Sequence, residues 1–163
     1  MSARETIGAL VLAAGKGTRM HSDKPKVLQE LLGAPMLRYV YTALDPLFGE
    51  GIWTVVGHRS EMIEQKFAGE ERNFIHQTEQ LGTGHALQTA WDELVESGLS
   101  HVLVVNGDTP LLPQPRLINF LKESLSNNAD IGFMTLTLLH PGSFGRVVRH
   151  HGDVAAIIEA KDY

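Results

Sequence analysis

The chain has 163 residues, of which 43% are hydrophobic and 20% charged, and its net charge is −5. This balance excludes disorder caused by low hydrophobicity, and the acidic excess excludes a globally basic surface that would attract nucleic acid. No apolar run reaches the roughly 18–20 residues of a membrane span. The absence of cysteine excludes disulfides, thiolate catalysis and cysteine-ligated metal sites. We therefore expect a cytoplasmic globular protein, and the length is typical of one domain.

Short apolar runs alternate with helical patterns along most of the chain. In chain order, we predict a strand at 7–14, a helix at 36–47, a strand at 52–56, a helix at 61–67, a strand at 73–76, a helix that Thr83 caps and Gly98 ends, a strand at 102–105 and a helix at 115–125. Such alternation predicts right-handed crossovers and a mostly parallel sheet. The last third lacks intervening helices, and there we predict a strand at 131–139 and an antiparallel hairpin of 146–149 with 154–159.

The most informative stretch follows the first predicted strand and reads Leu12-Ala13-Ala14-Gly15-Lys16-Gly17-Thr18-Arg19-Met20. Ligands of open α/β sheets bind beyond the carboxyl ends of the strands, where small residues let backbone N–H groups approach a phosphate or a base edge. Four basic residues gather here, opposed only by Asp23: Lys16, Arg19, Lys24 and Lys26. The context favours a small anionic ligand, while an ordinary tight turn and a solvated charged surface are the alternatives.

Two familiar phosphate-binding motifs do not fit this turn. A Walker loop needs glycine at the position of Leu10, and Ser or Thr at the position of Gly17. The dinucleotide fingerprint needs a third glycine where Met20 stands. The turn therefore indicates another kind of nucleotide or phosphate site.

The stretch from Leu12 to Met20, followed by Ser22-Asp23-Lys24-Pro25-Lys26-Val27-Leu28, resembles the signature of the sugar-1-phosphate nucleotidylyltransferases. The run 77–86, Gln-Thr-Glu-Gln-Leu-Gly-Thr-Gly-His-Ala, resembles the uracil-binding segment of the bacterial N-acetylglucosamine-1-phosphate uridyltransferases. Later blocks of that family match in order at 106–111 (Asn-Gly-Asp-Thr-Pro-Leu), 145–147 (Gly-Arg-Val) and 159–162 (Glu-x-Lys-Asp). The resemblance covers almost the whole chain.

The resemblance implies a Rossmann-like, three-layer α/β/α nucleotidyltransferase domain with a mostly parallel mixed sheet. It further implies that residues 1–163 are part of a pyrophosphorylase domain truncated on its C-terminal side. Later asparagines that complete the sugar and magnesium sites in the family lie beyond the match. The C-terminal left-handed β-helix, which carries acetyltransferase activity in the family and builds its homotrimer, is absent from the sequence.

The family reaction, in peptidoglycan and lipopolysaccharide precursor synthesis, joins UTP and N-acetylglucosamine 1-phosphate, releasing pyrophosphate and UDP-N-acetylglucosamine. Both reactants are anions, so catalysis consists mainly of positioning and charge stabilisation. By resemblance, Lys16 and Arg19 hold the triphosphate, Lys26 neutralises the α-phosphate, and Asp108 binds Mg²⁺. Taken locally, Asn106-Gly107-Asp108 also fits a simple turn.

The same resemblance assigns the base and sugar contacts. Gln77 pairs with N3–H and O4 of uracil, and Gly82 and Thr83 add backbone contacts at a helix N-terminus. Gly145 and Glu159 contact the sugar. The complete set of expected substrate contacts is Leu12, Ala13, Ala14, Gly15, Lys26, Gln77, Gly82, Thr83, Asn106, Gly107, Asp108, Gly145 and Glu159. Asn106 departs from the family, in which an aromatic residue usually stands there.

The residues leave two alternative functions open. The chain could act on another sugar or alditol phosphate or on the molybdenum cofactor, although the 77–86 block favours uridine and N-acetylglucosamine. It could also be a nucleotide-binding fragment without turnover. The eight histidines show no helical pair typical of a zinc protease, and we interpret them as surface or packing residues. The resemblance implies that His85 lies closer to the nucleotide, although the family pattern does not require it as a base.

Overall fold

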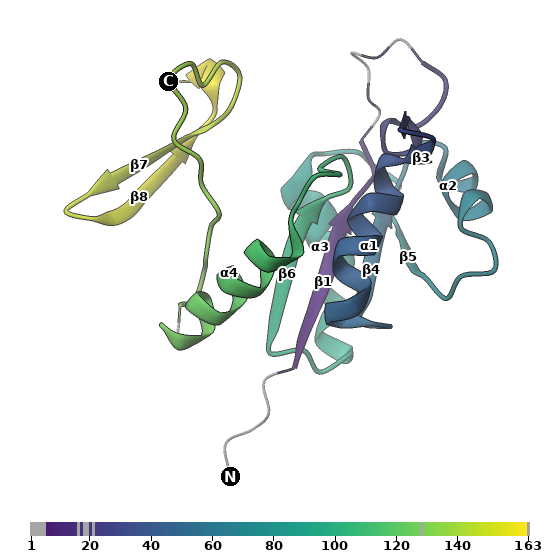
Figure 1. The fold of residues 1–163 in the computed structure, drawn as a ribbon, viewed down its shortest axis with the longest axis horizontal. Coiled ribbons are helices and arrows are strands. Elements are labelled where there is room, and N and C mark those ends of the chain that lie inside the picture. Colours follow the sequence, from purple (N-terminus) through teal and green to yellow (C-terminus); the bar gives the residue numbers. More distant parts are fainter. Residues whose placement is uncertain (1–5, 16, 18–19, 21, 128, 163) are drawn as a thin grey trace. The chain divides into compact units, whose positions relative to one another are not determined.

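A computed structural model of the chain describes residues 6–15, 17, 20, 22–127 and 129–162. The chain divides into two compact units, residues 1–117 and 118–163, which are described separately. Among the described residues no helix is long and apolar enough to cross a membrane. The first unit contains the sheet expected from the alternating pattern (Figure 1).

A parallel four-stranded sheet with the order β5-β4-β1-β6 forms the centre of the first unit. Its strands are β1 (Ile7–Leu12), β4 (Ile52–Val56), β5 (Asn73–His76) and β6 (His101–Asn106). Ala9 of β1 lies beside Ile52 of β4 and beside Leu103 of β6, so β1 is a central strand. The buried residues of β1 and β4 explain their uninterrupted apolar runs, because both faces of these strands are covered.

Helices α1 (Met36–Phe48) and α2 (Ser60–Lys66) cover one face of this sheet. Tyr41 of α1 is fully buried, and its hydroxyl lies 2.9 Å from the hydroxyl of Thr54 in β4. Phe67, which ends α2, packs edge-on against the Tyr41 ring at 5.0 Å between centroids. A 3-10 turn at Lys26–Leu28 and the two-residue strands β2 (Glu30–Leu31) and β3 (Ala34–Pro35) precede α1.

Helix α3 (Thr83–Glu96) covers the opposite face. Ala86, Ala90 and Leu94 pack in one buried cluster with residues of β1, β4 and β5 that include Trp53. The Trp53 indole N–H also donates a hydrogen bond to Glu93. Because successive strand residues point to opposite faces, Trp53 and Thr54 place α3 and α1 on opposite sides of the sheet. Figure 1 shows α1 in front of the sheet and α3 behind it, which confirms the three-layer α/β fold.

The ends of α3 differ in part from the prediction. Gly98 has the expected left-handed conformation, with φ of 69°. At the other end, Gly82 caps the helix with φ of 105°, and Thr83 is the first helical residue. The prediction of a Thr83 cap was wrong because the chain enters α3 through a positive φ that favours glycine.

The second unit contains most of α4 (Gln114–Ser126), which starts in the first unit, and the hairpin of β7 (Arg146–His150) and β8 (Asp153–Ile158). The hairpin is antiparallel, with Arg146 opposite Ile158 and His150 opposite Asp153. Its two turn residues, His151 and Gly152, both have positive φ, as a tight hairpin turn requires. A 3-10 turn at Ala160–Asp162 follows.

The strand predicted at 131–139 is not formed. This segment has no regular secondary structure, and its side chains are exposed, including Leu136 and Leu139. Strand structure requires hydrogen bonds to a neighbouring strand, and within the described residues none pairs with it. The apolar pattern therefore indicated a propensity for strand structure, but no strand among the described residues pairs with this segment.

Candidate functional site

The carboxyl ends of the parallel strands meet at one edge of the sheet in the first unit. The backbone N–H of Ala13 donates to the Val55 carbonyl at 2.8 Å, Gln77 N–H to Val56 at 2.8 Å, and Gly107 N–H to Leu12 at 2.9 Å. Sheet pairing thus continues past the strand ends. The order β5-β4-β1-β6 separates the residues after β5 from those after β6 by three strand spacings, roughly 14 Å. This edge suits an elongated ligand.

Close packing holds the loops at this edge together. A Cβ atom on Gly107 would lie 3.1 Å from Val27 Cγ1 and 3.2 Å from the Leu12 carbonyl oxygen. A Cβ on Gly17, whose φ is 59°, would lie 3.0 Å from Lys26 Cβ. The absent side chains let the loop after β1 contact both the turn after β6 and the Lys26 segment.

Lys26 and Asp108 form an ion pair at this edge. The ammonium Nζ lies 2.5 Å from Asp108 Oδ2, although 82 residues separate the two in sequence. Both side chains are partly exposed, Lys26 by 44% and Asp108 by 30%, so the pair adds little stability and can exchange partners. The turn that presents Asp108 is held by Thr109, whose hydroxyl donates to the Asn106 carbonyl at 2.6 Å. Residues 106–108 therefore form a turn, and this turn still leaves the Asp108 carboxylate able to bind a ligand.

The carboxylate chemistry at Asp108 fits a magnesium ion that arrives with a nucleotide. In the described part of the chain, no three His, Cys, Asp or Glu side chains gather into a protein-built metal cage. Mg²⁺ commonly keeps several waters and uses one or two carboxylates together with substrate phosphates. One accessible carboxylate is consistent with that mode of binding.

Gln77 lies at the other end of this edge, directly after β5, and is 4% exposed. Its side-chain nitrogen Nε2 lies 3.2 Å from the Gly82 carbonyl oxygen and 2.8 Å from His85 Nδ1. The sequence placed His85 close to the nucleotide without giving it a role, and the structure adds its direct contact with a predicted binding residue. The turn between β5 and α3 brings the side chains of Gln77 and His85 together, so local sequence patterns gave no signal for this hydrogen bond.

Gln80 is a residue at this edge to which the sequence analysis gave no role. Its side-chain oxygen Oε1 is buried and has no hydrogen-bond partner among the residues that the structure describes. A Cβ atom on Gly57 would lie 3.1 Å from Gln80 Nε2 and 3.0 Å from Ala14 Cβ, so the Gln80 side chain lies close to the residue that follows β4. A buried acceptor is costly unless a donor reaches it, which makes Gln80 a candidate ligand contact.

The remaining predicted site residues lie in the second unit or outside the described residues. Gly145 and Glu159 lie in the second unit, flanking the paired residues Arg146 and Ile158 at the open end of the β7-β8 hairpin. Lys16 and Arg19 lie outside the described residues, as does the side chain of Lys161. The described edge in the first unit comprises Leu12, Ala13, Ala14, Gly15, Lys26, Gln77, Gly82, Thr83, Asn106, Gly107 and Asp108.

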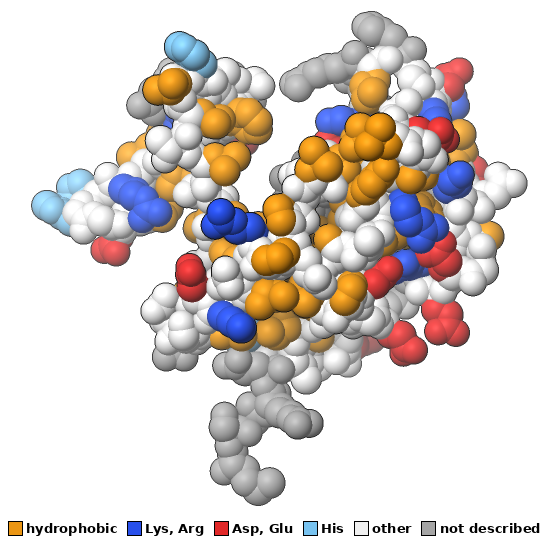
Figure 2. All heavy atoms as spheres, viewed as in Figure 1, with side chains coloured by type: hydrophobic (Ala, Val, Ile, Leu, Met, Phe, Trp, Pro, Cys, Tyr) orange, Lys and Arg blue, Asp and Glu red, His pale blue; other side chains and the backbone are white. Residues whose placement is uncertain are grey.

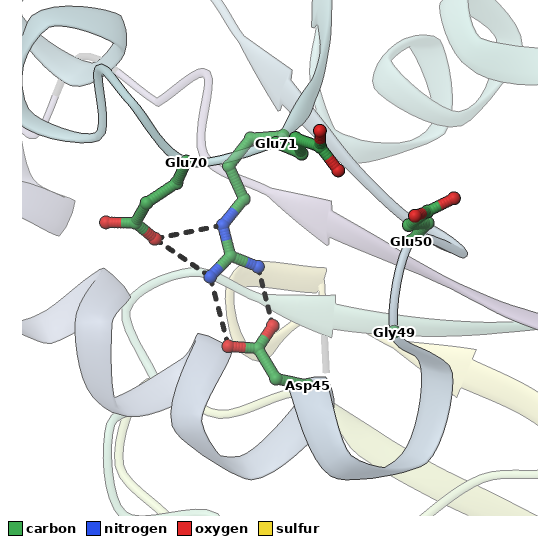
Figure 3. Close-up of a pocket in the computed structure, with 6 residues that line it drawn as sticks. Asp45, Gly49, Glu50, Glu70 and Glu71 are labelled. Atoms are coloured by element: carbon green, nitrogen blue, oxygen red, sulfur yellow. Dashed lines mark hydrogen bonds and ion pairs between the residues drawn. The ribbon is translucent and has the colours of Figure 1, made fainter.

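A charged cluster occupies the opposite, amino-terminal end of β4 and β5. Arg72 is 10% exposed and donates to both carboxylate oxygens of Asp45, at 2.6 and 3.0 Å, and to Glu70 at 3.0 Å (Figure 3). Arg38 donates to Glu70 as well. Figure 2 shows acidic and basic side chains interleaved on this side of the first unit. An open depression of about 380 Å³ lies here, lined by Asp45, Gly49, Glu50, Glu70, Glu71 and Arg72.

The electrostatics of this cluster indicate a structural role. Hydrogen bonds from Arg38, and then from Arg72, lower the pKa of Glu70 from 4.5 to about 2. The hydrogen bond to Asp45 raises the pKa of Arg72, and burial raises the pKa of Tyr41 to about 12. Arg72 also lies over the Tyr41 ring at 4.0 Å. These groups satisfy one another and lie far from the carboxyl ends of the strands, so the depression is not the candidate site.

Comparison with known proteins gives consistent results. A family model described as the MobA-like NTP transferase domain matches residues 9–158. The bifunctional protein GlmU of Nitratidesulfovibrio vulgaris strain Miyazaki F is 64% identical over 156 residues, which cover 96% of this chain and 34% of that protein. The GlmU of strain DP4 is 66% identical over 158 residues, which cover 97% and 34%. This chain therefore spans about a third of the length of these relatives.

A solved structure supports the same fold. The mannose-1-phosphate geranyltransferase from Thermus thermophilus has a TM-score of 0.66 and 22% sequence identity. The match covers 77% of this chain and 39% of that one.

Proposed function

The chain belongs to the MobA-like NTP transferase domain family, and we propose that the protein carrying it transfers a uridylyl group from UTP to N-acetylglucosamine 1-phosphate. The products are UDP-N-acetylglucosamine and pyrophosphate. The observation that supports this most directly is the Lys26–Asp108 pair beside the glycine-containing loop after β1. A cation and a carboxylate at one strand edge are the groups that phosphoryl chemistry needs.

The proposed reaction needs charge stabilisation more than proton transfer. A phosphate oxygen of the sugar phosphate forms a bond to the α-phosphorus of UTP. The bond from that phosphorus to the bridging oxygen of pyrophosphate breaks, and the electron pair leaves with pyrophosphate. The nucleophile is already ionised at neutral pH, so no strong general base is required. The protein's contribution is to align two anions and offset their repulsion.

Lys26 and Asp108 would divide this work when substrate binds. The ion pair is accessible, so an incoming α-phosphate can draw the Lys26 ammonium away from Asp108. The Asp108 carboxylate is then available to hold Mg²⁺, which when bound neutralises phosphate oxygens. We assign Lys16 and Arg19, which belong to the same loop in sequence, to the triphosphate and to the charge that develops on pyrophosphate.

The base and the sugar are assigned to the flanking residues. Gln77 is nearly buried after β5, and it faces the start of α3 at Gly82 and Thr83. The first backbone N–H groups of a helix have no partner within the helix and are available to a ligand. We place uracil there, against Gln77. Gly145 and Glu159 are assigned to the sugar, with the Glu159 carboxylate accepting hydroxyl protons. Asn106 in place of an aromatic residue would change the wall near the base or ribose.

The test is release of pyrophosphate from UTP and N-acetylglucosamine 1-phosphate by the full-length protein, with and without Mg²⁺. We expect metal-dependent turnover and preference for UTP over CTP and GTP. Replacing Asp108 with alanine should lower kcat by roughly 100-fold or more, while folding is preserved because the residue is partly exposed. Asp92→Ala, an exposed aspartate on α3, is the matched control and should leave turnover unchanged. Near-normal rates for Asp108→Ala, or preference for another nucleotide, would contradict the proposal.

A further inference from the structure

We infer that His85 is a positioning residue that holds the Gln77 carboxamide in one orientation and thereby sets the preference of the site for uracil over cytosine. The inference rests on the proposed function, because it concerns the base that Gln77 meets. It adds to that function a residue that does not itself touch the substrate.

The orientation of the Gln77 amide follows from Gly82. The terminal atom of Gln77 nearest to Gly82 lies 3.2 Å from a backbone carbonyl oxygen, which can only accept a hydrogen bond. That atom must therefore be the nitrogen, because an amide oxygen there would leave two acceptors facing each other.

The state of His85 follows from the same nitrogen. Gln77 Nε2 is 2.8 Å from His85 Nδ1, and an amide nitrogen only donates. His85 Nδ1 must therefore accept this hydrogen bond, which places the ring proton on Nε2. A flipped ring would put a carbon at this position, and 2.8 Å is too short for a carbon contact, since non-bonded carbons prefer about 3.5–4.0 Å.

Both N–H bonds of the Gln77 amide are therefore used inside the protein, one by Gly82 and one by His85. Its oxygen Oε1 receives no hydrogen bond from the part of the chain that the structure describes. What Gln77 can offer a base is an acceptor, so of the two expected pairings, with N3–H and with O4 of uracil, only the one with N3–H is retained. The N3–H of uracil can donate to it, whereas N3 of cytosine is itself an acceptor.

Accepting cytosine would require the Gln77 amide to turn over. The rotation would place Oε1 against the Gly82 carbonyl and would remove the donor from His85 Nδ1. Because Gln77 is only 4% exposed, water cannot readily compensate either loss. His85 is itself anchored in the first turn of α3, where the Thr89 hydroxyl donates to its carbonyl at 2.9 Å. Gly82 and His85 thus oppose amide rotation together.

The test compares two substitutions in the full-length protein. Asparagine keeps an acceptor at the position of Nδ1, because Oδ1 is the same number of bonds from the Cα atom. Leucine keeps side-chain bulk and removes the acceptor. The measurements are kcat and KM for UTP and for CTP, each with N-acetylglucosamine 1-phosphate, together with thermal unfolding of each variant.

For His85→Leu we expect kcat/KM for UTP to fall by roughly 5–10-fold, and the ratio of UTP to CTP turnover to fall by at least as much, which corresponds to one hydrogen bond. The loss should appear in KM, since the base is bound equally in the ground state and the transition state. His85→Asn should remain within about threefold of the wild type in both quantities. A merely structural role would lower thermal stability and would leave the UTP to CTP ratio unchanged.

Other outcomes overturn the inference. It fails if His85→Leu keeps the wild-type UTP to CTP ratio, or if His85→Asn behaves like His85→Leu. Should the leucine variant not fold, His85→Gln, which moves the amide one bond outward, takes its place with the same expectation. Failure of the proposed function is distinct, because the wild type would then not use UTP. In that case equilibrium titration with UTP and CTP decides, and a wild type that binds neither nucleotide overturns both proposals.

Discussion

Arg72 offers a sharp test of how the amino-terminal end of the sheet is held together. Its guanidinium is almost buried and joins α1 to the segment before β5, through Asp45 and Glu70. Replacing it with methionine keeps the length of the side chain but removes the charge and all of its donated hydrogen bonds. Asp45 would lose its ion-pair partner, whereas Glu70 would keep Arg38.

The expected cost can be derived from these contacts. Removing one partner of a buried ion pair typically destabilises a protein by about 3–5 kcal/mol. Asp45 is 42% exposed, so water recovers part of its solvation, and we expect the free energy of unfolding to fall by about 2–3 kcal/mol. At about 2–4 °C per kcal/mol, the melting temperature should fall by roughly 5–10 °C. Arg72→Lys should cost less, because it retains the charge but not the two-pronged geometry.

Thermal and urea unfolding of the 163-residue chain, followed by circular dichroism, measure these changes. Arg59→Met is the matched control, because Arg59 pairs with an Asp23 side chain that is 94% exposed. Such a pair is worth about 0–1 kcal/mol. If Arg72→Met shifts the melting temperature no more than Arg59→Met does, the cluster is not a structural anchor and our interpretation of it is wrong.

Two further predictions concern a glycine and an acid transition. Gly107→Ala should lower the free energy of unfolding by about 1–2 kcal/mol in urea titrations, because its Cβ would crowd Leu12. Gly84→Ala, with no atom within 4 Å, should not lower it. The lowered pKa of Glu70 contributes to the free energy of unfolding. This contribution is fully present above pH 4.5 and is lost as the pH falls through about 2. Glu70→Gln should therefore flatten the dependence of unfolding free energy on pH in that window, and an unchanged slope would contradict this.

The candidate site was predictable where local sequence and simple topology suffice. Leu12–Gly15, Gln77 and Asp108 lie at the ends of apolar runs or just after them, and the carboxyl ends of parallel strands share one edge. The structure places these residues in the first unit, and their roles at a binding site stay predictions. The contact of Gln77 with His85 and that of Gln80 with Gly57 did not follow from the sequence patterns. Each contact depends on how the turn after β5 folds back on nearby residues.

The sequence by itself determined the local elements, since periodicity and turn residues act over a few positions. The helix at Met36–Phe48, the strand at Ile52–Val56 and the turn at Gly152 all agree with its patterns. Tertiary structure alone decided the strand order and the Lys26–Asp108 pair across 82 residues. It also decided that residues 131–139 form no strand, because a strand exists only through hydrogen bonds to a partner that local sequence does not specify.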